Sequence, residues 1–362
     1  MRAARLHAYN QPLQVDEVAP PEISGHHDVI VRIGGAGLCR TDLHIIEGIW
    51  QNKVEVALPY TLGHENAGWV EAVGDAVTSV REGDAVIVHP LITCGYCEAC
   101  RRGEDMYCAS GSFPGINAEG GFAEYLRTSD RALIRLAEGV DPIDVAPYAD
   151  AGITAFRAAK KAARLLRPGN WAVVIGVGGL GHIAMQCVQN LCAASVIAVD
   201  PSPTAQALAR DLGADEVVGA VGADAVQAVH DLTGGGAHVV LDFVGERGAE
   251  RDAVAMLRQG GTNIVIGYGG RVDIPTIDVI FSEISVVGSL VGNYTELSEL
   301  MILQAQGKVK LHTQRYALDD IGTAVDDLDH GRIAGRGVLL PAASGATATA
   351  AAGSTEYSTA MP

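Results

Sequence analysis

The sequence predicts a two-domain α/β protein, in which a small and mostly β domain precedes a doubly wound parallel sheet. The 362 residues are enough to bury two hydrophobic cores. The first part of the chain consists of short apolar runs broken by Gly and Pro, whereas the middle alternates strand-like and helix-like segments around one glycine-rich turn. Such alternation is typical of parallel sheets that carry helices on both faces.

The first domain is expected to span residues 1–148. Its strands are short apolar runs bounded by turn residues, expected at 29–33, 67–73, 85–88 and 122–126. From residue 147 to residue 166 the pattern becomes helical, and Pro168-Gly169 ends it. We interpret this helix as the joint between the two domains.

The second domain is expected to span residues 149–290. It begins with a βαβ motif whose strand, turn, helix and second strand are expected at 172–175, 176–181, 182–191 and 196–199. Further helices and strands are expected in turn at 204–212, 239–243, 249–257 and 262–267. A series of this kind builds a parallel sheet that is wound in both directions.

The C-terminal part is expected to complete the first domain. Residues 291–341 would return to the first domain, beginning with a helix at 297–306. Residues 342–362 contain mainly Ala, Ser, Thr and Gly, and this composition cannot offset the entropy lost on ordering. We therefore predict a disordered tail.

Composition favours a protein that binds small molecules over one that binds nucleic acids or membranes. The formal net charge is -17 and the pI is near 5.0, whereas nucleic acids and anionic membranes bind basic surfaces. The N-terminus lacks the apolar core of a signal peptide, and no segment has the roughly 18 uncharged apolar residues of a membrane span. We expect a cytoplasmic protein.

Four closely spaced cysteines predict a structural zinc site in a lobe at residues 90–110. Spacers of two, two and seven residues separate Cys94, Cys97, Cys100 and Cys108, so all four thiolates can bind one tetrahedral ion. A four-sulfur site leaves no position for a substrate. The alternatives are free thiols and an iron–sulfur cluster, but the usual cluster sequence ends with a three-residue spacer and then proline after its last cysteine.

A second, catalytic zinc site is predicted from Cys39, His64 and Asp150. Cys39 begins a segment rich in polar side chains, and His64 lies in a Gly-His-Glu sequence. A catalytic zinc keeps one position open and therefore needs three protein ligands. Asp150 is the candidate third ligand, because an unpaired carboxylate in an apolar stretch is costly. The alternatives are a core thiol, a core histidine and a helix N-cap, respectively.

A dinucleotide site is predicted at the turn Gly176-Val177-Gly178-Gly179-Leu180-Gly181. Its glycines occupy the first, third and sixth positions between a strand and a helix, where backbone amides and the helix N-terminus bind a pyrophosphate. Asp200 closes the next strand and would accept hydrogen bonds from the ribose hydroxyls, although it could also be a plain turn residue. Since no Lys or Arg stands nearby to bind a 2′-phosphate, NAD is favoured over NADP.

Taken together, these residues resemble the zinc-dependent medium-chain alcohol dehydrogenases, and the resemblance extends from the N-terminus to about Pro341. Its specific parts are the Gly-His-Glu sequence with Gly68 and Gly74, the four-cysteine lobe and the nucleotide turn with Asp200. The resemblance implies a GroES-like catalytic domain, a Rossmann-type domain, two zinc ions, NAD and usually a homodimer or homotetramer. It therefore implies an alcohol dehydrogenase or ketone reductase.

The resemblance also implies roles for residues near the zinc. Cys39, His64 and Asp150 would bind the metal, Asp42 would orient the zinc-binding histidine, and Glu65 would approach the metal during ligand exchange. A proton relay would run from Thr41 through the nicotinamide ribose to His44 and solvent. Besides the turn glycines and Asp200, the implied cofactor contacts are Leu180, Arg40, Ile266 and Tyr268. Arg40 could equally be a solvated surface arginine.

By position in the family, the substrate pocket would be lined by Trp50, by Leu91 and Ile92 of the stretch 89–92, and by Tyr268 and Tyr294. Such a wall is bulky and mainly apolar, which favours a secondary or aryl alcohol over a polyol, although each residue could instead be ordinary packing. One departure concerns the cofactor: where many relatives have a pyrophosphate-binding arginine, this chain has Asn293-Tyr294.

Two alternative functions are left open. A polyol dehydrogenase of the same superfamily would bind zinc through a glutamate and a water in place of Asp150. A non-catalytic NAD-binding zinc protein would keep the fold without the relay residues.

Overall fold

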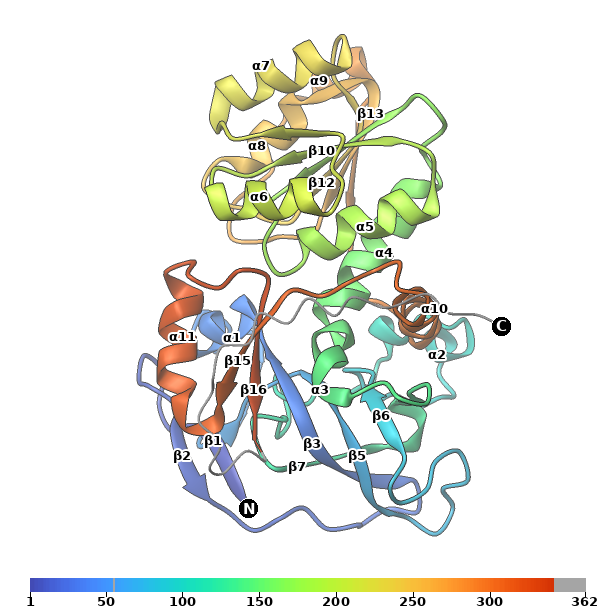
Figure 1. Cartoon of the computed structure of the whole chain (residues 1–362), viewed down its shortest axis with the longest axis vertical. Helices are drawn as coiled ribbons and strands as arrows, with labels where there is room; N and C mark the ends of the chain where they lie inside the picture. Colours follow the sequence, from blue (N-terminus) through green and yellow to red (C-terminus); the bar gives the residue numbers. More distant parts are fainter. Residues whose placement is uncertain (55, 342–362) are drawn as a thin grey trace, which may run out of the picture.

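The computed structural model describes residues 1–54 and 56–341 and confirms the predicted α/β fold class. Two lobes are separated by the green helices α4 (Ala151–Ala163) and α5 (Gly181–Leu191) in Figure 1. The chain before α4 and its last described strands form the lower lobe, and the middle of the chain forms the upper lobe. The disorder predicted for residues 342–362 lies outside the described residues.

The lower lobe contains a sheet of seven strands. Its order is β15-β16-β3-β5-β6-β8, with β7 paired to β3, and its strands are β3 (Asp28–Leu38), β5 (Glu65–Val73), β6 (Ala85–Val88), β7 (Tyr125–Ser129), β8 (Leu133–Arg135), β15 (Thr313–Ala317) and β16 (Arg336–Leu340). A three-stranded sheet lies beside it, formed by β2 (Gln14–Glu17), β1 (Arg2–Leu6) and β4 (Tyr60–Thr61). Antiparallel pairing of β16 with β3 brings the C-terminal segment beside the first long strand.

Short helices connect the strands of the lower lobe. They are α1 (Arg40–Ile46), α2 (Glu98–Arg101), η1 (Asp105–Tyr107), η2 (Asp130–Ala132), α3 (Pro142–Val145), η3 (Ala146–Ala149), η4 (Leu318–Asp320) and α11 (Ile321–Asp329). Of these, α1 and η3 matter most for function, because each meets a predicted zinc ligand at one of its ends.

The upper lobe is a six-stranded parallel sheet in the order β11-β10-β9-β12-β13-β14. Its strands are β9 (Trp171–Ile175), β10 (Ser195–Val199), β11 (Glu216–Val218), β12 (Ala237–Asp242), β13 (Leu257–Val265) and β14 (Ser285–Gly288). Its remaining helices are α6 (Pro203–Asp211), α7 (Gly222–Thr233), α8 (Ala249–Ala255) and α9 (Thr276–Ser282), whereas α10 (Tyr294–Ala305) packs against α4 and η3 beside the lower lobe (Figure 1). The strand order reverses between β9 and β12, and in such sheets ligands bind outside the carboxyl ends of the strands at this point.

The largest hydrophobic core joins the two lobes. It contains Ala67 and Ile87 from the lower sheet, Ile153 and Phe156 from α4, and Leu241 from the parallel sheet. Burial of one such large side chain stabilises the fold by about 1.5–3 kcal/mol. Because α4 packs against both lobes, the residue at its N-terminal end is held in a fixed position.

Two predicted elements differ from the observed ones for identifiable reasons. The helix expected from residue 147 begins as an α-helix only at Ala151 and is preceded by the 3-10 turn η3, which has a proline in its first turn. Strand β3 continues beyond the expected end at residue 33, because glycines allow its neighbour to approach closely: a Cβ on Gly37 would lie 1.9 Å from Oε2 of Glu65.

Candidate active site

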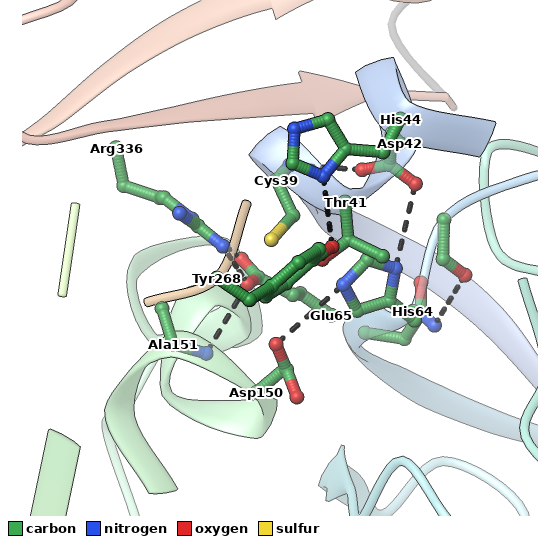
Figure 2. Close-up of polar contacts among 12 residues, drawn as sticks. Cys39, Thr41, Asp42, His44, His64, Glu65, Asp150, Ala151, Tyr268 and Arg336 are labelled. Atoms are coloured by element: carbon green, nitrogen blue, oxygen red, sulfur yellow. Dashed lines mark hydrogen bonds and ion pairs between the residues drawn. The ribbon is translucent and has the colours of Figure 1, made fainter. Parts of the chain in front are cut away.

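The three predicted ligands of the catalytic zinc meet in one buried cluster. Cys39 lies between β3 and α1, His64 lies directly before β5, and Asp150 lies between η3 and α4. One ligand atom from each, together with one from Glu65, lies within 4.8 Å of the others. Figure 2 shows these side chains converging from three separate parts of the lower lobe.

Carboxylates face both ring nitrogens of His64. Oδ1 of Asp42 lies 3.4 Å from Nδ1, and Oδ2 of Asp150 lies 3.5 Å from Nε2. Asp42 is itself fixed at the start of α1, because its Oδ2 accepts a hydrogen bond of 2.8 Å from the backbone N–H of Cys39. Burial would lower the pKa of His64, but the two carboxylates outweigh it and the pKa lies well above its ordinary value. The two carboxylates around His64 therefore favour a positive charge at this place.

Asp150 occupies the N-cap position of α4 without acting as a cap. Its side chain makes no capping hydrogen bond and instead approaches His64. The residue is only 9 % exposed. A buried carboxylate that leaves nearby helix amides unused and points at an imidazole is more consistent with a metal ligand than with the N-cap alternative.

Glu65 forms a buried ion pair beside the three predicted ligands. Arg336, at the start of β16, contacts both of its carboxylate oxygens, with Nε 3.0 Å from Oε2, and the backbone N–H of Ala151 also donates to it. The sequence reasoning did not identify Arg336. Nothing in the local sequence marks it, since its partner is 271 residues away.

The donor set fits zinc. A thiolate, an imidazole nitrogen and a carboxylate are all accepted zinc ligands, and three of them leave one position open. Nδ1 of His64 and Oδ1 of Asp42 are buried, and neither makes a hydrogen bond of accepted geometry among the described residues. The distance between Nδ1 of His64 and Oδ1 of Asp42 would shorten if Nε2 bound a metal and Nδ1 carried the proton.

The four cysteines of the lobe also converge. Their ligand atoms lie within 4.8 Å of one another, and the sulfur of Cys100 lies 3.5 Å from that of Cys97 and 3.9 Å from that of Cys94. Tetrahedral zinc with bonds of about 2.3 Å requires sulfurs about 3.8 Å apart. The backbone N–H groups of Tyr96 and Cys97 lower the pKa of Cys94 to about 6, which favours the thiolate. The arrangement therefore fits a structural zinc.

The glycine-rich turn has the shape that a dinucleotide requires. Gly176 has a φ of 85°, and a Cβ on Gly181 would lie 1.8 Å from the carbonyl oxygen of Gly176, so both positions need glycine. No atom of the described residues lies within 4 Å of the Cβ position of Gly178. The turn leads directly into α5, whose N-terminus favours a phosphate. Leu180, the predicted contact within the turn, is the N-cap residue of this helix.

The other predicted cofactor residues lie at neighbouring strand ends. Asp200 follows β10, and its carboxylate accepts hydrogen bonds from the backbone N–H groups of Val177 (2.8 Å) and Ser202 (2.9 Å). Arg40 lies 3.6 Å from Oε1 of Glu246, so it reaches the loop after β12. Ile266 follows β13 and packs against the interlobe core. Beside the turn, a Cβ on Gly179 would lie 2.7 Å from Nη1 of Arg336, which adds a cation that the sequence reasoning missed.

Thr41 and His44 are joined by a third residue. The hydroxyl of Tyr268 lies 3.1 Å from Oγ1 of Thr41 and 2.9 Å from Nδ1 of His44, and Figure 2 shows its ring crossing the front of the cluster. Burial, followed by the charge of Arg40, lowers the pKa of His44. The imidazole is therefore neutral near pH 7 and able to accept a proton.

The residues predicted to line the pocket lie in three places. Trp50 packs near Tyr268, with ring centroids 6.0 Å apart. The backbone of Leu91 contacts the ring of the buried His89, which lies 6.4 Å from the ring of Tyr294. Ile92 forms an isolated antiparallel β-bridge with Ser112 and lines a separate groove of about 540 Å³ beside the N-terminus.

Asn293 and Tyr294 each make a hydrogen bond that stabilises the fold around α10. Asn293 caps α10, because its side chain accepts a hydrogen bond of 2.8 Å from the backbone N–H of Glu296. Tyr294 donates its hydroxyl to the carbonyl of Leu133 at 3.0 Å. Asn293 thus fixes the start of α10, and Tyr294 joins α10 to the lower lobe.

Among the described residues, no helix is long and apolar enough to cross a membrane.

Comparison with known proteins gives consistent matches along the chain. The family model of the alcohol dehydrogenase GroES-like domain matches residues 25–138, and that of the zinc-binding dehydrogenases matches residues 179–306. An alcohol dehydrogenase of Geobacillus stearothermophilus is 35% identical over 94% of this chain and 98% of its own length. An NAD-dependent alcohol dehydrogenase of Sulfurisphaera tokodaii is 34% identical over 94% of this chain and 100% of its own length. The crystal structure of the Aeropyrum pernix alcohol dehydrogenase superposes with a TM-score of 0.92 at 49% identity, covering 94% of this chain and 100% of that one.

Proposed function

The chain belongs to the zinc-dependent medium-chain alcohol dehydrogenases, and we propose that it interconverts a secondary or aryl alcohol and the corresponding ketone with NAD. The observation that carries this proposal is the convergence of Cys39, His64 and Asp150 in one buried cluster at the start of α1, the helix that carries Thr41 and His44 (Figure 2). Metal ligands and a proton acceptor in one place are what alcohol oxidation requires.

When bound, zinc would supply a Lewis acid for the substrate oxygen, and NAD would supply the hydride acceptor. In this proposal Cys39, His64 and Asp150 hold the metal, and Asp42 fixes the tautomer of His64 by accepting a hydrogen bond from Nδ1. Glu65 remains paired with Arg336, which keeps the fourth ligand position open.

The relay residues remove the hydroxyl proton of the substrate. Thr41 accepts this proton at Oγ1, and His44 receives it at Nδ1 because burial keeps the imidazole neutral. His44 is the last-turn residue of α1 and only 8 % exposed. The relay therefore begins beside the metal ligands and ends at a residue with a small opening to solvent.

For the cofactor, we propose that the turn from Gly176 to Gly181 binds the pyrophosphate and that Asp200 binds the adenosine ribose. Asp200 already accepts two backbone N–H groups, which fixes its carboxylate at the end of β10. A negative charge at this place disfavours the 2′-phosphate of NADP. Arg336 places a positive charge beside Gly179. This chain has Asn293-Tyr294 at the sequence position where many relatives have a pyrophosphate-binding arginine.

We propose that the molecule is a homodimer, or a homotetramer built from such dimers, joined through the edge of the parallel sheet. Strand β14 is the last strand of that sheet, and it is exposed along its length together with α9. Ile280 and Phe281 of α9 are 69% and 73% exposed. A second copy related by a two-fold axis would cover this apolar edge.

We also propose a cytoplasmic location. All seven cysteines are free thiols, and six of them would lose their roles as ligands or core residues if paired by oxidation. A reducing compartment keeps such thiolates available for zinc. Fractionation of the source cells, with detection of the protein by antibody, tests this.

The substrate proposal is tested by comparing kcat/KM for 1-phenylethanol and for sorbitol, with purified zinc-loaded protein and NADH absorbance as the readout. The bulky side chains of Trp50 and Tyr268 near the relay lead us to expect a preference for 1-phenylethanol. A preference for sorbitol would instead favour the polyol dehydrogenase alternative. The absence of NAD-linked oxidation of any alcohol would favour the non-catalytic alternative.

A further inference from the structure

The hydroxyl of Tyr268 bridges the two residues between which the family relay places the nicotinamide ribose. Its distances to Oγ1 of Thr41 and Nδ1 of His44 are 3.1 Å and 2.9 Å, both within hydrogen-bond range. Thr41 and His44 belong to α1 of the lower lobe, whereas Tyr268 belongs to the loop after β13 of the upper lobe. The bridge therefore spans the two lobes.

The position of Tyr268 is fixed by its surroundings. Its ring lies edge-on to that of His44, with centroids 5.0 Å apart, and packs beside Trp50. The glycines on either side allow the loop to run close to the loop after β12: a Cβ on Gly267 would lie 2.4 Å from the backbone of Val244, and Gly269 has a φ of 141°. Loop shape and ring packing both direct the hydroxyl toward α1, as Figure 2 shows.

We propose that Tyr268 is a further relay residue, whose hydroxyl carries the substrate proton directly from Thr41 to His44. This inference rests on the proposed function of the same site. In the direction that leaves Thr41 able to accept the substrate proton, Thr41 donates to the oxygen of Tyr268, and Tyr268 donates to Nδ1 of His44, which is then unprotonated. The remaining lone pairs of Oγ1 of Thr41 are free to accept a proton from the substrate.

The proposed step balances. Oxidation breaks the O–H and the C–H bond of the alcohol and forms the carbonyl. The hydride, with both electrons of the C–H bond, goes to NAD, which is reduced. The hydroxyl proton goes to Thr41, while the proton of Thr41 passes to Tyr268 and that of Tyr268 passes to His44. The imidazolium then loses one proton to water, so that one proton and one NADH appear per alcohol oxidised.

The test is the substitution Tyr268→Phe in the zinc-loaded full-length protein, which removes the hydroxyl and keeps the ring. We expect the single-turnover rate of NADH formation at neutral pH to fall by roughly 100-fold, the lower range for a lost acid–base group. The dissociation constant of NADH, measured by fluorescence, should stay unchanged. Tyr316→Phe is the matched control, because its hydroxyl donates to Asp327 and makes no hydrogen bond to Thr41 or His44 in the described structure, and its rate should equal that of the wild type.

Two further readouts separate a relay role from a merely structural one. In histidine-labelled free protein, the ¹⁵N signal of Nδ1 of His44, assigned with His44→Gln, should shift in Tyr268→Phe and stay in place in Tyr316→Phe. The double variant Tyr268→Phe/His44→Gln should be no slower than the slower single variant, since both interrupt one path. Unchanged turnover in Tyr268→Phe, or losses that multiply in the double variant, would overturn the relay.

Failure of the proposed function gives a different result. If the wild type oxidises no alcohol with NAD, the proposed function fails. If the wild type is active and Tyr268→Phe is equally active, only the relay inference fails. If Tyr268→Phe lowers turnover solely by weakening NADH binding, Tyr268 is a cofactor contact, and the relay inference is again wrong.

Discussion

Among the single residues of the site, Asp150 has the side chain whose position is most closely constrained by its surroundings. It begins α4, which is packed against both lobes, and its carboxylate points at Nε2 of His64 instead of capping the helix. His64 faces this carboxylate directly, and the buried Arg336 adds a favourable charge nearby. We therefore expect binding of the catalytic zinc to depend on Asp150.

Asp150→Ala should reduce bound zinc from two ions per chain, one for each cluster, to one. The loss of a direct ligand should lower kcat/KM by at least about 100-fold, the effect already expected for a change behind a ligand. Zinc counting by atomic emission, together with NADH absorbance, measures both. Asp144→Ala is the control, since Asp144 pairs with Arg315 in an exposed contact. Unchanged zinc content in Asp150→Ala would remove Asp150 from the site and favour a glutamate and water ligand set.

Replacing only one partner of the ion pair between Glu65 and Arg336 should lower the free energy of unfolding. Both side chains are almost fully buried, and removing one partner leaves an uncompensated charge, which costs about 3–5 kcal/mol. We therefore expect Arg336→Met to lower the free energy of unfolding in urea by about 3 kcal/mol. The double variant Glu65→Gln/Arg336→Met should recover much of this loss. A double variant as unstable as the single one would mean that packing, and not charge, is what Arg336 contributes.

The residue types in the site could be predicted, but not all of their contacts. Cys39, His64 and the four lobe cysteines are indicated by type and spacing, because metal ligands are few and distinctive. Arg336 lies in a strand that meets Glu65 only through the topology of the lower sheet. The bridge by Tyr268 depends on the approach of two lobes. Neither contact has a local sequence signal.

At the scale of elements, the start of α5 connects the nucleotide turn to the lower lobe. His182, in its first turn, is fully buried: Nδ1 lies 2.7 Å from the carbonyl oxygen of Gly178, and Nε2 lies 3.4 Å from the backbone N of His312. The ring thus donates from Nδ1 and accepts at Nε2. Burial lowers the pKa of His182 to about 4, so the folded protein keeps this ring neutral.

This buried histidine predicts a loss of stability in mild acid. The pKa is about 6.5 in the unfolded chain and about 4 in the folded one, so stability present above pH 6.5 is lost as the pH falls toward 4. Between pH 7 and pH 4.5 the loss due to this group is about 2 kcal/mol. Urea unfolding at both pH values should show a smaller acid loss in His182→Gln than in the wild type. Equal acid losses in the two proteins would contradict the assignment.

The element pattern of the upper lobe was more predictable than that of the lower lobe. Its strands are buried on both faces and read as continuous apolar runs, such as β9 and β10. The lower lobe contains short elements whose ends are set by tertiary contacts. Helix α1, for example, was not expected, because its polar sequence lacks helical periodicity and its start is fixed by the contact of Asp42 with the backbone of Cys39.

At the scale of the whole molecule, one apolar edge is unlike the rest of the described surface. Strand β14 and helix α9 are exposed on consecutive apolar residues, including Val286, Val287, Ile280 and Phe281. An exposed edge strand of this kind pairs readily with another strand. The molecular form with this edge covered is the proposed dimer.

A charge on this edge should dissociate the dimer. In sedimentation velocity, Phe281→Asp/Val287→Asp should shift the protein from the dimer or tetramer mass toward that of the 37.6 kDa chain, because buried unpaired charges are costly. Val221→Lys is the control, since Val221 is also exposed but lies before α7, away from β14. A wild type that is monomeric, or a double variant that keeps its mass, would place the interface elsewhere or remove it.

The account as a whole requires a metal ion bound by Cys39, His64 and Asp150, beside the relay and apart from the cysteine lobe. Crystals of the zinc-replete protein with NADH, measured on both sides of the zinc absorption edge, test this directly. The prediction is two anomalous peaks per chain, one within bonding distance of all three side chains and one among the four lobe cysteines. A single peak, confined to the lobe, would contradict the proposed chemistry.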